Sequence, residues 1–192
     1  FDPVGYQGPL ARMPQLGFEV LSQIYDGRFY PRDGRPPVPL DATDAAYINA
    51  RYDFGLWTVD QFIGELLASI PTAVLQNTLI VLHGVHGEDL GEHKYFGHYD
   101  IFDTEVRSTL IVLSPKTKRE GTRVEAQVEG VDLAPTLLDI LGLPPMSGAL
   151  GTSARSVLEA GVGDPDRPAF VERIPLWEDI FRYRSLMPED YV

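Results

Sequence analysis

Imidazole and carboxylate side chains gather in one short stretch of this chain, between residues 83 and 98. The 4 histidines of the sequence all lie in this stretch: His83, His86, His93 and His98. The carboxylates among them are Glu88, Asp89 and Glu92. Imidazoles and carboxylates bind metal ions and carry protons in active sites. The stretch therefore predicts a metal-binding or catalytic loop, and the simpler alternative is a polar surface loop that contains histidines.

The position of this loop is more informative than its spacing. The spacing matches no H-E-x-x-H pattern, and the chain has no cysteine for a zinc or redox motif. The loop follows Thr78–Leu82, a uniformly apolar and β-branched run that is typical of a buried strand in a parallel sheet. Open α/β sheets build their sites at the carboxyl ends of such strands. We therefore expect the strand to deliver the loop into a site.

The remaining elements alternate helices with strands, which predicts an α/β fold. Apolar residues recur every three or four positions from Asp41 to Ile70 and indicate a helix that Pro71 ends. Its expected buried stripe is Ile48, Tyr52, Leu56, Val59, Ile63, Leu66, Leu67 and Ile70. Further strands are expected at Thr109–Leu113, Val124–Val128 and Pro168–Glu172, and further helices at Val131–Leu141, capped by Asp132, and Ala154–Glu159.

The first part of the chain, Phe1–Pro39, is rich in proline and glycine and predicts irregular, turn-rich structure, with 17–25 as the one stretch suited to a short element. Loops of this kind line a site or wrap the surface, and the sequence favours neither. We expect a single domain portion in which 1–40 forms loops that line the site, 41–172 forms the α/β core and 173–192 forms a tail.

Composition excludes several classes of function. The chain has 192 residues and a net charge of −12, which argues against nucleic-acid binding and against docking on an anionic membrane. No apolar run approaches the length of a membrane span. An anionic substrate would need local positive charge, from a metal ion or from a few basic side chains, to overcome this field. The cellular compartment stays unknown.

Several motifs resemble those of one family. The stretch Asn77–His98, NTLIVLHGVHGEDLGEHKYFGH, resembles a segment of the sulfatases, within the alkaline-phosphatase superfamily, that reads roughly N-T-L-I-V-F-T-S-D-H-G-E-x-L-G-E-H followed by G-H or G-K. Residues 52–64 resemble the helix that precedes this segment, and 130–138, GVDLAPTLL, resembles the family's V-D-x-x-P-T-L-L helix. Asp2-Pro3 and Tyr6 resemble its D-P-H-x-P-Y loop, so that the resemblance covers roughly 1–172.

The resemblance implies a hydrolase of sulfuric or phosphoric esters that uses a divalent cation (Ca²⁺, Mg²⁺, Mn²⁺ or Zn²⁺) and a small anionic ester substrate. It implies an alkaline-phosphatase-like sheet flanked by helices, incomplete at its N-terminal side. His86 falls on a metal-binding position, and His98 falls on the residue that contacts the bound sulfate or phosphate. We therefore expect His86 and Glu88 as metal ligands, and His98 and His93 as catalytic residues.

The sequence also departs from the family pattern. Val85 stands where the family has a metal-binding Asp, and Val4 stands where it has the histidine of D-P-H. The family's nucleophile, a Cys or Ser in C/S-x-P-x-R, does not occur in these 192 residues, since Ser114 is followed directly by a proline. We expect the chain alone to be inactive.

The incomplete sheet would expose an edge, so we expect a homo-oligomer or pairing with an N-terminal segment. One alternative is a non-catalytic, sulfatase-like binding or structural module. Another is an unrelated acidic α/β domain.

Overall fold

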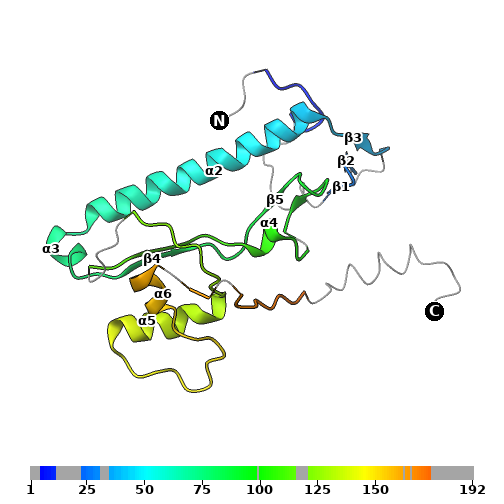
Figure 1. Cartoon of the computed structure of the whole chain (residues 1–192). Helices are drawn as coiled ribbons and strands as arrows, with labels where there is room; N and C mark the ends of the chain where they lie inside the picture. Colours follow the sequence, from blue (N-terminus) through cyan, green and yellow to red (C-terminus); the bar gives the residue numbers. More distant parts are fainter. Residues whose placement is uncertain are drawn as a thin grey trace, which may run out of the picture.

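The computed structural model describes residues 5–11, 23–30, 35–98, 100–115, 121–161, 163–164 and 166–173. Its helices are α2 (Ala42–Ser69), α3 (Thr72–Leu75), α4 (Asp103–Val106), the 3₁₀ helix η1 (Gly130–Asp132), α5 (Leu133–Leu141) and α6 (Arg155–Ala160). Its strands are β1 (Ile24–Tyr25), β2 (Arg28–Phe29), β3 (Val38–Pro39), β4 (Ile80–His83), β5 (Asp89–Leu90), β6 (Phe96–Gly97) and β7 (Leu110–Leu113). Figure 1 shows α2 along one side of β4, with α5 and α6 on the opposite side.

The strands of the described residues form three small sheets, and every pairing in them is antiparallel. The apolar strand before the histidine loop, β4, pairs with β7 from Ile80↔Leu113 to His83↔Leu110. The prediction of parallel pairing is therefore wrong for this pair. A uniformly apolar strand indicates that both faces tend to be covered, but it carries no information about direction, which the intervening loop decides.

The long helix α2 begins and ends where the sequence predicts. The Asp41 carboxylate accepts hydrogen bonds from the backbone N–H groups of Thr43, at 2.7 Å, and Asp44, at 3.0 Å, and the Asp44 side chain caps Asp41 in return. Burial of the whole apolar stripe is not observed: Leu56 and Val59 are each 54% exposed. Among the described residues, the neighbours of α2 bury its first turns, and the later stripe residues are exposed or only half-buried.

The hydrophobic core lies at the N-terminal end of α2. Its buried residues are Leu10, Ile24, Phe29, Tyr47, Ile48 and Phe96. The Tyr6 ring stacks on Tyr47 with centroids 4.0 Å apart, and its hydroxyl donates a hydrogen bond of 2.5 Å to Asp44. Phe96 belongs to β6 and lies two positions before His98. The core therefore fixes the strand that leads directly into the histidine cluster.

The C-terminal elements agree with the sequence in part. Helices α5 and α6 form where they are expected, and α5 ends at Gly142 in the left-handed conformation, with φ of 70°. The predicted strands at 124–128 and 168–172 do not form in the described residues. Short apolar runs favour a strand only when a partner offers backbone hydrogen bonds, and no strand in the described part of the chain pairs with either run.

The described part of the first 40 residues is less irregular than predicted, since the short strands β1, β2 and β3 pair into one sheet. Most of the stretch 17–25 lies outside the described residues, as does the tail beyond residue 173. Within the described part of the chain, no helix is both long and apolar enough to cross a membrane.

Candidate functional site

The antiparallel pair β5–β6 brings two of the predicted site residues face to face. Asp89 pairs with Gly97 and Leu90 with Phe96. Continuing this register by one residue places Glu88 opposite His98, and the Nδ1 of His98 lies 3.0 Å from Oε2 of Glu88. Residues ten positions apart therefore meet because the β5–β6 hairpin folds the loop back on itself.

His86 joins this pair through the loop that precedes β5. Gly87 approaches α4 so closely that an added Cβ would lie 2.1 Å from the carbonyl oxygen of Thr104, and its N–H donates to the carbonyl of Glu105 at 2.6 Å. Only glycine fits this position, and it holds His86 in place. The His86 ring stacks on the His98 ring with centroids 3.8 Å apart, and its Nδ1 lies 2.6 Å from the carbonyl oxygen of Gly87.

The outcome is a cluster of three side chains, His86, Glu88 and His98, which each offer one ligand atom within 4.8 Å of the others. The side chain of Glu88 is 16% exposed and that of His98 is 36% exposed, so the cluster opens to solvent. Val85 lies beside it and is 88% exposed. The other valine of interest, Val4, lies outside the described residues.

His93 lies apart from this cluster, in a second network organised by Asp89. The fully buried Asp89 accepts hydrogen bonds from His93 Nδ1, from the N–H groups of Gly91 (3.1 Å) and His93 (3.3 Å), and from the Thr104 hydroxyl (3.2 Å). Phe102 stacks on the His93 ring with centroids 3.7 Å apart. Burial raises the pKa of Asp89, but these hydrogen bonds outweigh it and hold the pKa below its ordinary value.

Asp89 is therefore occupied within its own network and lies outside the three-residue cluster. Glu92 accepts a hydrogen bond of 2.6 Å from the N–H of Leu90 and shapes the turn between β5 and β6. His83 is an exposed residue at the end of β4 and is also outside the cluster. The structure thus divides one histidine-rich loop into three residues that converge and others that support the loop.

Sequence reasoning missed the residues that support this loop from neighbouring elements. Buried Glu105 on α4 accepts hydrogen bonds from the Tyr95 hydroxyl and, at 2.6 Å, from the N–H of Asp100. Burial is the main reason that the pKa of Glu105 is raised. On α2, burial and then the charge of Glu88 raise the pKa of Tyr52, which places this phenol near the cluster. The one available signal was the polar run 103–105, which directly follows the loop.

The donor set of the cluster fits a divalent metal. Two imidazole nitrogens and one carboxylate oxygen are the ligands that zinc and related ions bind. The Nδ1 of His86 lies within hydrogen-bonding distance of the Gly87 carbonyl, and such a hydrogen bond orients metal-binding histidines and leaves Nε2 for coordination. Three protein donors leave positions for water or a substrate oxygen, as catalytic rather than structural metal sites do.

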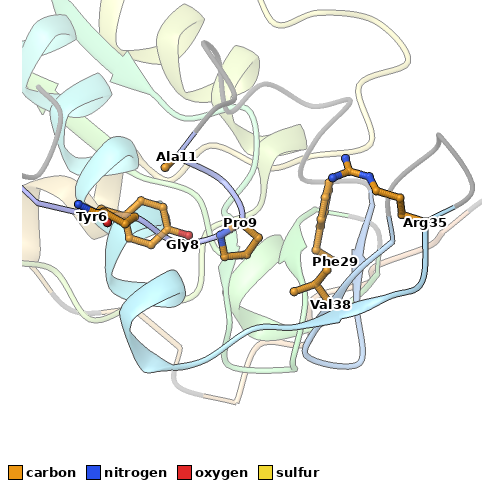
Figure 2. Close-up of a pocket in the computed structure, with 8 residues that line it drawn as sticks. Tyr6, Gly8, Pro9, Ala11, Phe29, Arg35 and Val38 are labelled. Atoms are coloured by element: carbon orange, nitrogen blue, oxygen red, sulfur yellow. The ribbon is translucent and has the colours of Figure 1, made fainter.

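A separate cavity of about 510 Å³ lies beside the sheet β1–β2–β3. Figure 2 shows Tyr6 and Pro9 on one side of it and Phe29, Val38 and Arg35 on the other. None of the three cluster residues lines it. The early segments of the chain therefore line a hollow, but not one that contains the histidines.

The chain shares sequence with characterised sulfatases. It is 37% identical over 102 residues to an N-acetylglucosamine-6-O-sulfatase of Bacteroides thetaiotaomicron, which is 53% of this chain and 18% of that protein. It is 32% identical over 95 residues to arylsulfatase K of Danio rerio, covering 49% of this chain and 18% of that protein. The chain thus spans about a fifth of the length of these relatives.

Two solved structures also resemble part of this fold. A protein solved in complex with its substrate D-glucosamine-2-N,6-O-disulfate matches with a TM-score of 0.51 and 36% identity, over 54% of this chain and 21% of that one. A phosphonate monoester hydrolase from Silicibacter pomeroyi matches with a TM-score of 0.52 and 34% identity, over 57% of this chain and 22% of that one. The expected α/β, alkaline-phosphatase-like fold is confirmed, and the match covers about a fifth of each of these two structures.

A sequence model of the Sulfatase family matches residues 24–143, which include the cluster, both strands that flank the loop and helices α2 and α5. This stretch is more than half of the chain, and the predicted resemblance is confirmed. The chain belongs to the sulfatase family.

Proposed function

We propose that this chain forms the metal-binding part of a hydrolase that cleaves sulfuric or phosphoric esters with the help of a divalent cation. The observation that carries the proposal is the convergence of His86, Glu88 and His98 within the family's characteristic loop. Similarity to an N-acetylglucosamine-6-O-sulfatase and to a phosphonate monoester hydrolase supports the reaction class, since both names describe anionic esters.

The bound cation would supply positive charge to the non-bridging oxygens of the ester. His86 and Glu88 would hold this cation, and His98 lies at the position where the resemblance expects contact with the anionic group. His93 would serve as a positioned imidazole, because Asp89 and Phe102 fix its ring on two sides. A net charge of −12 on the chain makes such a local positive centre necessary for an anionic substrate.

We further propose that these 192 residues alone turn over no ester. They contain neither a cysteine nor a serine in S-x-P-x-R, so the family's nucleophile has no counterpart among them. The test compares the turnover of aryl sulfate and aryl phosphate by these 192 residues with the turnover by the whole protein expressed from its natural gene, called here the natural-length protein. Expected are background rates for the chain alone and, for the natural-length protein, a turnover that a chelator abolishes and added metal restores. Metal-independent turnover, or none in the natural-length protein, would contradict the hydrolase proposal.

The second candidate function is a non-catalytic, sulfatase-like module. The observation that favours it is Val85, which stands where the family has a metal-binding Asp and is 88% exposed. The isopropyl group of this valine has no atom that can bind a metal ion. Because Val85 is in solvent, Val85→Asp should change the free energy of unfolding by less than about 0.5 kcal/mol.

The double variant Val85→Asp, Val4→His discriminates the two functions. If the valines disable the site, the variant should bind a divalent cation more tightly than the wild type, measured by calorimetric titration, and gain turnover in the natural-length protein. A matched control, Val74→Asp, changes an exposed valine on α3 and should leave metal affinity unchanged. Equal affinities of the double variant and the wild type would mean that the valines do not limit metal binding.

A further inference from the structure

We infer that the cavity between the segment 6–11 and the strands β2 and β3 binds a small ring compound that bears an anionic group, with Arg35 as the partner of that group. The cavity shares no lining residue with the cluster of His86, Glu88 and His98, so the inference goes beyond the proposed function. It stands on the walls of the cavity, on its size and on the charge that lines it.

The first wall of the cavity is the turn that contains Tyr6, and its own contacts fix it. The Tyr6 ring stacks on Tyr47, and its hydroxyl donates a hydrogen bond to Asp44. A Cβ added to Gly8 would lie 2.2 Å from this hydroxyl oxygen, so the backbone passes directly against it. The N–H of Ala11 donates to the carbonyl of Gly8 at 3.1 Å and closes the turn. A wall fixed in this way loses little conformational freedom when a ligand binds.

The second wall is formed by β2 and β3. Phe29 pairs with Val38 in antiparallel register, which places both side chains on one face of the sheet, and both line the cavity. Arg28 and Pro39 form the next pair and lie on the opposite face, because side chains alternate along a strand. Phe29 is 3% exposed and belongs to the hydrophobic core, so packing holds this wall in place as well.

The size and the flat apolar surfaces of the cavity suit a ring compound. Its volume of about 510 Å³ lies within the range of about 300–1,000 Å³ that ligand pockets of proteins have. Figure 2 shows Pro9 on one side of the cavity and Phe29 on the other. Aromatic faces pack well against other rings. A ring that enters between these two side chains would therefore bury apolar surface on both of its faces.

Arg35 decides which ring compound fits. It is the single charged side chain among the described residues that line the cavity, and no carboxylate lies among them. The chain as a whole has a net charge of −12, so a lining with a cation and without an acidic group differs from the rest of the molecule. A guanidinium group binds carboxylate and sulfate groups through paired N–H donors. The expected ligand is therefore a ring that carries a carboxylate or a sulfate group.

The experiment titrates benzoate and D-glucuronate into the natural-length protein by calorimetry. These compounds carry a carboxylate on an aromatic ring and on a sugar ring, and neither is a sulfuric or phosphoric ester. At least one of them should bind about tenfold or more tightly than its neutral counterpart (benzyl alcohol or D-glucose) and than acetate, because the ring and the charge both contribute. The tighter of the two identifies the kind of ring. Failure of both to bind, or equal binding of acetate, would overturn the inference.

Two variants and a chelator locate the binding. Arg35→Gln removes the charge and should weaken binding of the anionic ring by about tenfold or more. The matched control Arg28→Gln changes the same residue type on the opposite face of the sheet and should leave the affinity within about threefold. Equal affinities of Arg35→Gln and the wild type would overturn the inference. A chelator should not change the affinity, and a loss of binding with chelator would place the anion at a metal ion and overturn the inference too.

A measurement on the unmodified protein covers the case in which a variant fails to fold. Proton NMR should show nuclear Overhauser contacts between the ring protons of the bound compound and the methyl groups of Val38, and none to Val74, which is exposed on α3. Contacts elsewhere on the protein but not at Val38 would overturn the inference. Because these readouts need no turnover, a protein that cleaves esters but binds neither compound would contradict this inference and leave the proposed function intact.

Discussion

Among the residues that the structure describes, two aspartates are fully buried, and they hold their charges in different ways. Asp89 in β5 is stabilised by an imidazole, a hydroxyl and two backbone N–H groups, next to the histidine cluster. Asp132 in η1 faces Arg167, whose guanidinium contacts its two carboxylate oxygens at 2.7 and 2.9 Å. Burial of a carboxylate therefore indicates only that it matters for the structure. The side chains that bind it show whether it supports a functional site.

The partners also decide what each aspartate holds together. Asp132 accepts hydrogen bonds from the N–H groups of Glu129, at 2.9 Å, in its own turn and of Thr152, at 2.8 Å, and with Arg167 it ties two distant segments to the start of α5. Its carboxylate was expected to cap that helix, but it makes no capping bond there and instead joins the 3₁₀ turn to distant residues. Asp89 acts more locally, on the histidine loop and the neighbouring helix α4. We therefore expect Asp132 to contribute more to stability, and Asp89 to contribute more to the geometry of the site.

The strongest test of this comparison is Asp132→Ala. The variant loses the bidentate ion pair with Arg167 and leaves the N–H groups of Glu129 and Thr152 without their acceptor. We expect the free energy of unfolding to fall by about 3 kcal/mol, measured by urea denaturation. The control Asp60→Ala removes an exposed aspartate of α2 and should cost less than about 0.5 kcal/mol. Equal effects of the two variants would show that Asp132 is not a structural hub.

A smaller effect is expected for Asp89→Asn, about 1–3 kcal/mol, because the amide keeps the shape but not the charge that accepts hydrogen bonds from His93 and Thr104. The control is Asp53→Asn on the exposed face of α2. The same variant should loosen the His93 ring, which shows as broadened or averaged imidazole signals in NMR. A stable protein with an unchanged His93 signal would contradict the role given to Asp89.

The pH dependence of this variant has a definite sign. The pKa of Asp89 is lower in the folded protein than its ordinary value of 3.8. Its contribution to stability is therefore fully present above that ordinary value and is lost as the pH falls through the lowered folded pKa. Between about pH 4 and pH 2, unfolding free energy should fall more steeply in the wild type than in Asp89→Asn. Parallel curves would mean that the Asp89 charge contributes no stability.

The smallest effect is expected for Thr104→Val, which removes one hydrogen bond of 3.2 Å to Asp89 and keeps the side-chain shape. We expect a loss of about 0.5–1.5 kcal/mol in unfolding free energy. Thr58→Val serves as the control, because its hydroxyl bonds only to the exposed carbonyl of Phe54 in its own helix. A larger effect at position 58 than at position 104 would remove Thr104 from the network around Asp89.

The sequence alone determined the elements that depend on local chemistry. Possible caps at Asp41, Thr43 or Asp44 and the break at Pro71 bound helix α2 in the sequence, since unpaired N–H groups need an acceptor and proline cannot continue a helix; the structure selects Asp41 as the cap. Gly142 and the proline pair after it likewise set the end of α5. The motif around His86 pointed to the family, and the family model matches residues 24–143, which contain this motif.

Only the tertiary structure decided which loop residues meet. Spacing along the chain did not distinguish His98, which joins Glu88 across the β5–β6 hairpin, from His93, which turns to Asp89 and Phe102. The reason is that strand register and the approach of Gly87 to α4 are set by contacts between segments far apart in sequence. Strand direction and the exposure of α2 follow the same rule: an apolar pattern states a preference for burial, and the packing of other segments determines whether it is met.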